Sequence, residues 1–260
     1  MRLIWLLTSF LFLLPAQLLQ AAEPDSLDAH QWFVEGKRLK KAQKTRKAII
    51  RLEKSAAAFM EVLQWKRAIE AYALAGQYAS ELEQNFEEAD RLIKQAIGLA
   101  DLHFPEKDPV CLYVKKTFIN HQYDQGNYEV VINLCRALLP LEEEVYGPGS
   151  LQLAETHNLI GISLGYSGQY EQAFAKYQQA LAIYEQGLGR DHPAAANTLM
   201  NMGVYYERQA DYDNALSYYE ESRLINVKHK GYDSYGNASC LANIGNVYQF
   251  KGDYQQAGAY

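Results

Sequence analysis

Residues 197–219 read NTLMNMGVYYERQADYDNALSYY, a stretch of small residues, tyrosines and polar groups without a nucleophile–base pair or a metal-ligand spacing. Gly203 in this stretch has counterparts at equal spacing on either side, at Gly161 and Gly245, which defines a 42-residue period. The same period recurs in further columns: Tyr170, Tyr212 and Tyr254; Ala173, Ala215 and Ala257; Ala154, Ala196 and Ala238; and Gly147, Gly189 and Gly231. Tyr128 and Phe86 extend the tyrosine column toward the N-terminus. So many columns in one phase indicate an internal repeat, the signature of an array of stacked units.

Each period is predicted to be a pair of helices. Pro193 suits the first turn of a first helix, and Asp211 is placed to cap a second helix that begins at Tyr212. In most periods a glycine directly precedes the cap, where it ends the first helix in a left-handed conformation at little cost. Ala210 stands at this place, so a different turn is expected in this unit. The cap position holds Asn127, Gln169 and Asp253 in the other periods.

The repeated residues of this stretch are interpreted as packing residues. Gly203 lies in mid-helix, which costs about 1 kcal/mol relative to alanine. That cost is acceptable if the missing side chain lets the second helix of the pair approach the first helix closely. Ala215 is expected to be the small residue that faces Gly203. Tyr212 and Tyr219 are expected to fill the space between helices. One pair cannot bury its apolar faces alone, so the pairs are expected to stack into a continuous core.

Residues 187–225, GLGRDHPAAANTLMNMGVYYERQADYDNALSYYEESRLI, resemble a tetratricopeptide repeat in the 42-residue form known from kinesin light chains and many bacterial multi-repeat proteins. The run GRDHP at 189–193 is part of that likeness, which is strongest over 149–260. The resemblance implies an all-α fold, a right-handed superhelical solenoid of antiparallel helix pairs. It also implies that the first helices line a concave groove that holds a peptide or a partner protein.

Composition argues against several function classes. Hydrophobic residues make up 48% of the 260 residues, which is ample for a core. The 25 Lys+Arg against 31 Asp+Glu argue against a nucleic-acid partner held by phosphate contacts. Cys111, Cys135 and Cys240 fit neither a disulfide framework nor a zinc pattern and are interpreted as small buried residues. The sequence contains no HExxH pair, phosphate loop or nucleophile elbow, so no enzyme activity, metal or cofactor is expected.

The N-terminus reads MRLIWLLTSFLFLLPAQLLQAAEP and has the layout of a secretory signal peptide over residues 1–22. We therefore expect an exported protein, periplasmic or secreted, of the bacterial multi-repeat type. The alternative is an uncleaved membrane anchor, because residues 3–22 approach the length of a membrane-spanning helix. The sequon Asn237-Ala238-Ser239 matches a glycosylation site, although such short motifs also occur by chance.

Residues 23–64 are helical in pattern but out of phase with the repeat, and an irregular helical cap is predicted there. Between Lys37 and Lys54, nine basic residues face a single acid, Glu53. These bases are interpreted as the solvated face of the cap. Alternatively, they contact a membrane surface or an acidic partner.

The repeat array itself is predicted over residues 65–260, as about four full repeats and a truncated fifth. Residues 65–82 fit either the first or the second helix of a pair. Because the last helix stops after about two turns, we expect the chain to be a fragment of a longer polypeptide.

Binding residues are expected on the stripe of the first helices that the core does not use. That stripe holds Lys116, Asn120, Tyr123, Glu155, Asn158, Asn197, Asn201, Glu207, Arg208, Asn243, Asn246 and Gln249. Asparagine recurs in it, and amides both donate and accept hydrogen bonds, which suits the backbone of an extended peptide. In chaperone-binding members of the family, basic residues and asparagines clamp a terminal carboxylate. Lys116 and Asn120 match part of that set, but Leu159 stands where an asparagine is expected, which argues against such a clamp.

The predicted function is that of a protein-interaction scaffold that binds at equilibrium, without turnover. The alternative is the sensor or recruitment arm of a longer enzyme or signalling protein. A CHAT-type peptidase, cyclase or kinase domain would then lie beyond residue 260, as in bacterial relatives of this layout.

Overall fold

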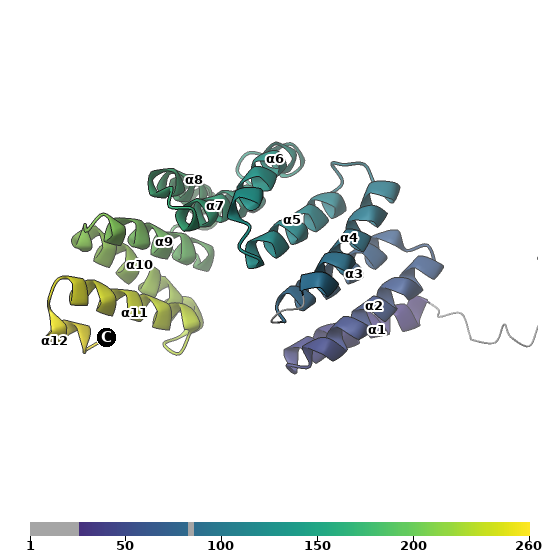
Figure 1. The fold of residues 1–260 in the computed structure, drawn as a ribbon, viewed down its shortest axis with the longest axis horizontal. Helices are drawn as coiled ribbons and strands as arrows, with labels where there is room; N and C mark the ends of the chain where they lie inside the picture. The colour runs from purple at the N-terminus through teal and green to yellow at the C-terminus, as the bar shows by residue number, and fades with distance from the viewer. Residues whose placement is uncertain (1–25, 83–85) are drawn as a thin grey trace, which may run out of the picture. The chain divides into compact units, whose positions relative to one another are not determined.

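The computed structural model describes residues 26–82 and 86–260, so the predicted signal peptide at 1–22 lies outside the described residues. The described residues form twelve α-helices and no strand, which confirms the predicted all-α fold (Figure 1). The chain divides into two compact units, the first ending at His103 and the second beginning at Phe104. No helix in the described ranges is both long and apolar enough to cross a membrane.

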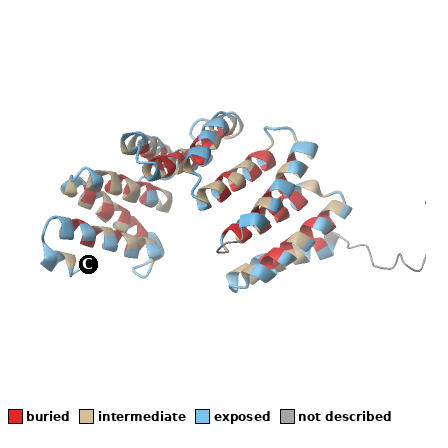
Figure 2. Cartoon of the chain, in the orientation of Figure 1, coloured by how far each residue is buried: buried red, intermediate tan, exposed pale blue. Residues whose placement is uncertain are grey.

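The helices of each unit follow one another as pairs joined by short turns. Unit 1 contains α1 (Ser26–Lys41), α2 (Thr45–Glu61), α3 (Trp65–Ser80) and α4 (Phe86–His103). Unit 2 contains α5 (Pro109–Asp124), α6 (Tyr128–Tyr146), α7 (Leu151–Tyr166), α8 (Tyr170–Leu188), α9 (Pro193–Arg208), α10 (Tyr212–Lys230), α11 (Tyr235–Phe250) and α12 (Tyr254–Ala257). Within unit 2 each second helix also contacts the first helix of the next pair, so that the pairs stack. Buried residues follow the packed faces, and exposed residues cover the outer ones (Figure 2).

Two mid-helix glycines of unit 2, Gly161 and Gly203, face aromatic rings on the second helix of their own pair. A Cβ atom added to Gly203 would lie 2.6 Å from Cε1 of Tyr219, and one added to Gly161 would lie 2.5 Å from Cε1 of Tyr177. Tyr219 is fully buried beneath the first helix. The expectation that Gly203 makes room for the second helix is therefore confirmed. The three atoms nearest to the added Cβ all belong to the Tyr219 ring, a contact that the repeat pattern did not assign to Gly203.

Residues 26–61, which fall outside the phase of the repeat, form a pair with the same kinds of contact. A Cβ added to Gly36 would lie 2.7 Å from Cγ of Leu52. The Ser55 hydroxyl donates a hydrogen bond of 2.7 Å to the Ala29 carbonyl. In α9 and α10, the Ser222 hydroxyl donates to the Ala196 carbonyl at the same distance and the same separation in sequence. The next helix of unit 1, α3, packs against both α2 and α4 and is the first helix of the α3–α4 pair.

The turn that ends the first helix is the same whether or not it contains glycine. Gly168 has a φ of 77°, and Ala210 adopts a φ of 57° in the equivalent place. Both turns close with the same backbone bonds: Gly168 N–H to the Gly165 carbonyl, and Ala210 N–H to the Glu207 carbonyl. The expected difference at Ala210 is therefore wrong, because alanine tolerates the left-handed conformation at a cost of about 1–2 kcal/mol.

The predicted helix caps are partly confirmed. The Asp211 carboxylate accepts from the Asn214 N–H, and the Asp253 carboxylate caps the following second helix in the same way. Pro193 occupies the first turn of α9, where His192 Nδ1 accepts from the Ala194 N–H. Asn127 makes no cap hydrogen bond; its side-chain amide nitrogen donates to the side-chain oxygens of Gln122 and Gln125.

Replacing Ala210 by glycine removes the left-handed strain. We expect the free energy of unfolding of the Ala210→Gly variant, measured in urea titrations, to be about 0.5–1 kcal/mol higher than that of the wild type. The control is Ala182→Gly at an exposed position within α8, which should lower that free energy by about 1 kcal/mol. A loss of stability in both variants would contradict the strain assigned to Ala210.

Adding a methyl group at Gly203 tests the glycine-to-ring contact. Although alanine favours a helix, Gly203→Ala forces the Tyr219 ring to move. It should lower the free energy of unfolding by about 1–2 kcal/mol. In Gly98→Ala, where no atom lies within 4 Å of the added Cβ, the same change should raise it by about 1 kcal/mol. The free energies are measured by circular dichroism during urea unfolding. An equal increase in the free energy of unfolding in both variants would show that the contact between Gly203 and the Tyr219 ring does not constrain the α9–α10 pair.

Candidate functional site

The structure places every predicted groove residue on a first helix of unit 2. Lys116, Asn120 and Tyr123 lie on α5, Glu155 and Asn158 on α7, Asn197, Asn201, Glu207 and Arg208 on α9, and Asn243, Asn246 and Gln249 on α11. The exposed members are Asn120, Glu155, Asn197, Arg208, Asn246 and Gln249, and the rest are half-buried. All of these residues therefore lie on first helices, but they differ in how freely a partner could reach them.

Three of the half-buried residues already serve contacts within the chain. Lys116 Nζ donates to Thr156 Oγ1 at 2.5 Å. The Asn158 side-chain oxygen accepts from the Thr198 hydroxyl at 3.1 Å, which joins α7 to α9. The Glu207 carboxylate accepts from the Tyr219 hydroxyl at 2.8 Å. These side chains hold helices together, so they are poorer candidates for a partner than the exposed ones.

Lys116 also neutralises a buried acid. Its Nζ lies 3.8 Å from a carboxylate oxygen of Glu142, whose side chain is only 3% exposed. Burial raises the pKa of Glu142, and the Lys116 charge opposes that shift. A buried carboxylate without its cation would be strongly unfavourable, so Lys116 has a structural role on α5.

A stacked contact recurs where one pair meets the next, and we call this place a joint. A joint comprises the end of a first helix, the start of its second helix and the end of the next first helix. Tyr128 stacks on Tyr166 with ring centroids 4.7 Å apart, and Tyr212 stacks on Phe250 at 6.4 Å. In the middle joint the Arg208 guanidinium lies 4.9 Å from the centre of the Tyr170 ring. All three contacts join equivalent positions of the repeat, so the middle joint differs by having a cation in place of an aromatic ring.

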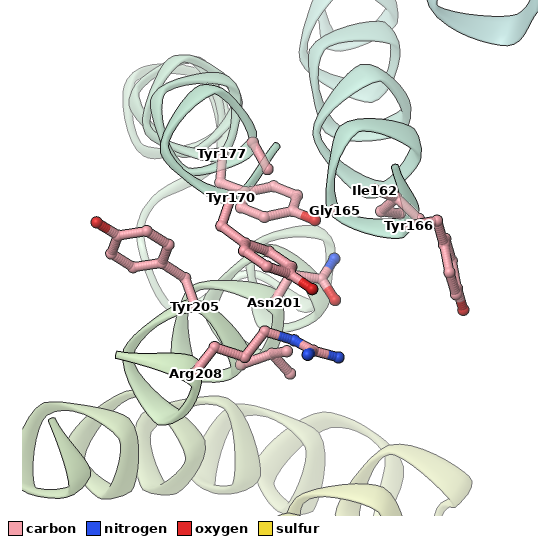
Figure 3. Close-up of a pocket in the computed structure, with 10 residues that line it drawn as sticks. Ile162, Gly165, Tyr166, Tyr170, Tyr177, Asn201, Tyr205 and Arg208 are labelled. Carbon is pink, nitrogen blue, oxygen red and sulfur yellow. The ribbon is translucent and has the colours of Figure 1, made fainter. Parts of the chain in front are cut away.

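The middle joint, formed by α7, α8 and α9, contains a cavity of about 240 Å³ (Figure 3). It is lined by Ile162, Gly165 and Tyr166 of α7, by Tyr170, Ala173 and Tyr177 of α8, and by Asn201, Val204, Tyr205 and Arg208 of α9. Asn201 and Arg208 were predicted from the sequence, whereas the other lining residues were not. We call this cavity the joint pocket.

A sequence signal for the joint pocket exists at position 165. Gly165 occupies the column that holds Tyr123 in the preceding period and Glu207 in the following one. The Tyr123 ring contacts Tyr128 and Tyr166 edge-on in its own joint. Glycine offers no side chain to fill the equivalent space, which leaves the joint pocket open. This difference between Gly165 and its counterparts in the other periods is the signal in the sequence that indicates the joint pocket.

Each polar side chain that lines the joint pocket can donate a hydrogen bond, and Arg208 can only donate. In Figure 3 the hydroxyls of Tyr170 and Tyr177, the Asn201 amide and the Arg208 guanidinium point to the same side of the pocket. Burial, with a smaller contribution from the neighbouring phenols of Tyr123 and Tyr166, raises the pKa of Tyr177. Its hydroxyl therefore remains protonated at neutral pH. Arg208 is the charged residue of the lining and forms no ion pair with any other described residue.

The basic stretch of unit 1 is partly neutralised. Lys40 and Arg51 pair with Glu81 and Glu35, and Lys37 and Lys54 lie over the rings of Phe33 and Trp32. The remaining bases are Arg38, Lys41, Lys44, Arg46 and Lys47, which are all exposed around the turn between α1 and α2. Any contact with an acidic partner or a membrane surface would rest on these five side chains.

Other candidate chemistry finds no support among residues 26–82 and 86–260. These residues contain no cluster of three or more metal-ligating side chains. Cys111, Cys135 and Cys240 are buried free thiols, as interpreted from the sequence. Asn237 of the sequon is 4% exposed, and its amide nitrogen donates to the Tyr232 carbonyl at 2.6 Å. The folded chain therefore does not present this asparagine for glycosylation.

Solved structures with a similar fold include BtubC (BKLC) from P. vanneervenii, with a TM-score of 0.66 and 20% identity over 92% of this chain and 87% of that chain. A STAND signal transduction ATPase with a tetratricopeptide repeat sensor, from Pyrococcus horikoshii, has a TM-score of 0.71 and 16% identity over 90% of this chain and 35% of its own. A Rap protein complexed with competence and sporulation factor has a TM-score of 0.61 and 13% identity over 93% and 79% of the two chains. At these identities the likeness shows the fold alone.

Sequence comparison identifies the family. A search of curated proteins finds no match. The family model of the tetratricopeptide repeat matches residues 118–186, 166–225 and 194–260, which together cover more than half of the chain. The chain therefore belongs to the tetratricopeptide repeat family, whose members are generally protein-interaction scaffolds.

Proposed function

We propose that the protein is an interaction scaffold that binds a segment of a partner protein across the first helices of unit 2, at equilibrium and without chemical turnover. The joint pocket carries this proposal. It is a cavity of about 240 Å³ between α8 and two of the first helices that carry the exposed polar stripe, α7 and α9. Binding sites are commonly concave places where a few polar groups converge, and the joint pocket meets that description.

The exposed stripe supports an extended partner. Asn197 on α9 and Asn246 on α11 are exposed, and Asn120 is exposed on α5. These amides recur on the first helices and can pair with the donors and acceptors of a peptide backbone. The joint pocket would then hold one side chain of the segment, while the amides hold its backbone.

The second candidate is a sensor or recruitment arm of a larger signalling protein. The likeness to a STAND protein with a tetratricopeptide repeat sensor favours it, since this chain matches 35% of that protein's length. The binding surface would be the same in both cases. They differ in whether binding regulates a further domain.

The proposal is tested by selecting 12-residue peptides from a displayed random library against the purified protein, and by measuring their affinity by calorimetry. Asn201→Ala combined with Arg208→Ala should weaken a selected peptide at least tenfold without lowering the melting temperature. The matched control is Gln172→Ala combined with Gln178→Ala, two exposed positions of α8, which should leave the affinity unchanged. An affinity that is lost in the control and retained in the α9 variant would overturn the proposed surface.

Substitutions of Lys116 and Asn120, which lie one turn apart on α5, should distinguish a residue that stabilises the fold from a residue that is available to a partner. Lys116→Ala leaves Glu142 buried and unpaired and should lower the free energy of unfolding by about 1–3 kcal/mol at pH 7. Asn120→Ala should change it by less than about 0.5 kcal/mol, because this side chain is exposed.

The Lys116→Ala deficit should also depend on pH. Burial raises the pKa of Glu142, so above the ordinary carboxyl pKa the folded state binds more protons than the unfolded state. Stability then falls as pH rises and recovers as pH is lowered. The deficit of Lys116→Ala should therefore be smaller at pH 5 than at pH 7 in urea titrations. A deficit that is constant between these values would argue against an unpaired Glu142 charge as its cause.

A further inference from the structure

Tyr177 and Tyr219 occupy the same column of the repeat but have different partners. Tyr219 donates to the Glu207 carboxylate at 2.8 Å, so the joint of α9, α10 and α11 supplies an acceptor from its own first helix. In the joint of α7, α8 and α9, the position of Glu207 is taken by Gly165. The Tyr177 hydroxyl therefore faces the joint pocket without the carboxylate that its counterpart has.

The space for that carboxylate is open. A Cβ added to Gly165 would lie 3.7 Å from the Tyr177 hydroxyl, an ordinary van der Waals distance, and would meet no other atom within 4 Å. Figure 3 shows the Tyr177 hydroxyl directed toward Gly165 from the opposite side of the pocket. A carboxylate entering from outside would thus meet a protonated hydroxyl at the place where Glu207 meets Tyr219.

A cation stands beside this open place. Arg208 is held by the Tyr170 ring, which fixes the guanidinium at the rim of the joint pocket. Of the arginines of unit 2, Arg190 and Arg223 pair with glutamates of the chain, whereas Arg136 and Arg208 pair with no described acid. A stacked guanidinium is well suited to a carboxylate, because it offers several donors in one plane.

We infer that the joint pocket is a receptor for a carboxylate side chain, aspartate or glutamate, of the bound partner segment. The carboxylate would accept hydrogen bonds from Tyr177 and Arg208 and replace the internal acid that Gly165 omits. This inference rests on the proposed function and specifies the anchor residue of the partner. Exposed first-helix residues lie both before and after the pocket, on α5 and α11, so a segment can continue on both sides. That arrangement favours a side chain over a chain terminus.

The first test needs no partner. Gly165→Glu restores the carboxylate of the column, and Gly165→Gln adds the same bulk without the charge. If the site accepts a carboxylate, Gly165→Glu should melt about 2 °C or more above Gly165→Gln, and that difference should disappear when Arg208→Gln is added to both. A difference of zero, or one that persists without Arg208, would overturn the inference and leave the scaffold proposal intact.

The second test uses arrays of 12-residue peptides in matched sets. Each set contains one glutamate or its glutamine equivalent, with either a free or an amidated C-terminus. Binding should require the glutamate and tolerate C-terminal amidation. It should weaken at least tenfold with Gly165→Glu or Tyr177→Phe, and persist with Gly165→Ala, which adds only a methyl group at an ordinary distance.

The remaining outcomes of the array also decide between the proposals. Binding that needs a free C-terminus would overturn the assignment to a side chain. Binding that is equal for glutamate and glutamine but blocked by Gly165→Glu would keep the pocket and reject the carboxylate. Peptide binding that is unchanged by every variant of α7, α8 and α9 would reject the joint pocket as the site, and with it the proposed binding surface.

Discussion

The contact between a mid-helix glycine and a tyrosine ring of the following helix is the constraint on which the two central pairs of unit 2, α7–α8 and α9–α10, depend. At Gly161 and Gly203 the absence of a side chain lets the ring of Tyr177 or Tyr219 lie directly against the first helix. The helix pair is thereby closed by a large buried side chain. The same ring extends to the end of the first helix, where its hydroxyl becomes available to a joint. A single residue therefore serves both core packing and the chemistry of the surface.

The joints differ from one another, whereas the α7–α8 and α9–α10 pairs share this packing. In the three joints the stacked contact is formed by Tyr128 with Tyr166, by Tyr170 with Arg208, and by Tyr212 with Phe250. A 42-residue period allows such variation because the residues that differ in the middle joint, Gly165 and Arg208, lie in other columns than the glycine and the ring of the core contact. Two changes distinguish the middle joint, a glycine that opens space and an arginine that brings charge. Neither change disturbs the glycine-to-ring contact, so a site can arise without loss of the fold.

Charge is distributed unequally along the chain. Residues 26–103 contain thirteen bases and eleven acids, whereas residues 104–260 contain eleven bases and eighteen acids. An acidic segment approaching unit 2 would therefore be repelled at long range, although salt screens this repulsion beyond about 8 Å at physiological ionic strength. Recognition of a carboxylate in unit 2 must come from short-range hydrogen bonds at one place. Such an arrangement provides selectivity more than speed of association.

Features that depend on local or periodic pattern were determined by the sequence alone. The 42-residue period, the helix pairs, Pro193 at a helix start and the Asp211 cap all follow from residues close together or in phase. Tertiary structure decided what meets across helices: Tyr219 beneath Gly203, and Lys116 beside Glu142. Such contacts join residues on different helices. The pattern of residues along the sequence does not specify in which direction these side chains point. The joint pocket belongs with them, because an empty space is defined only by the helices that surround it.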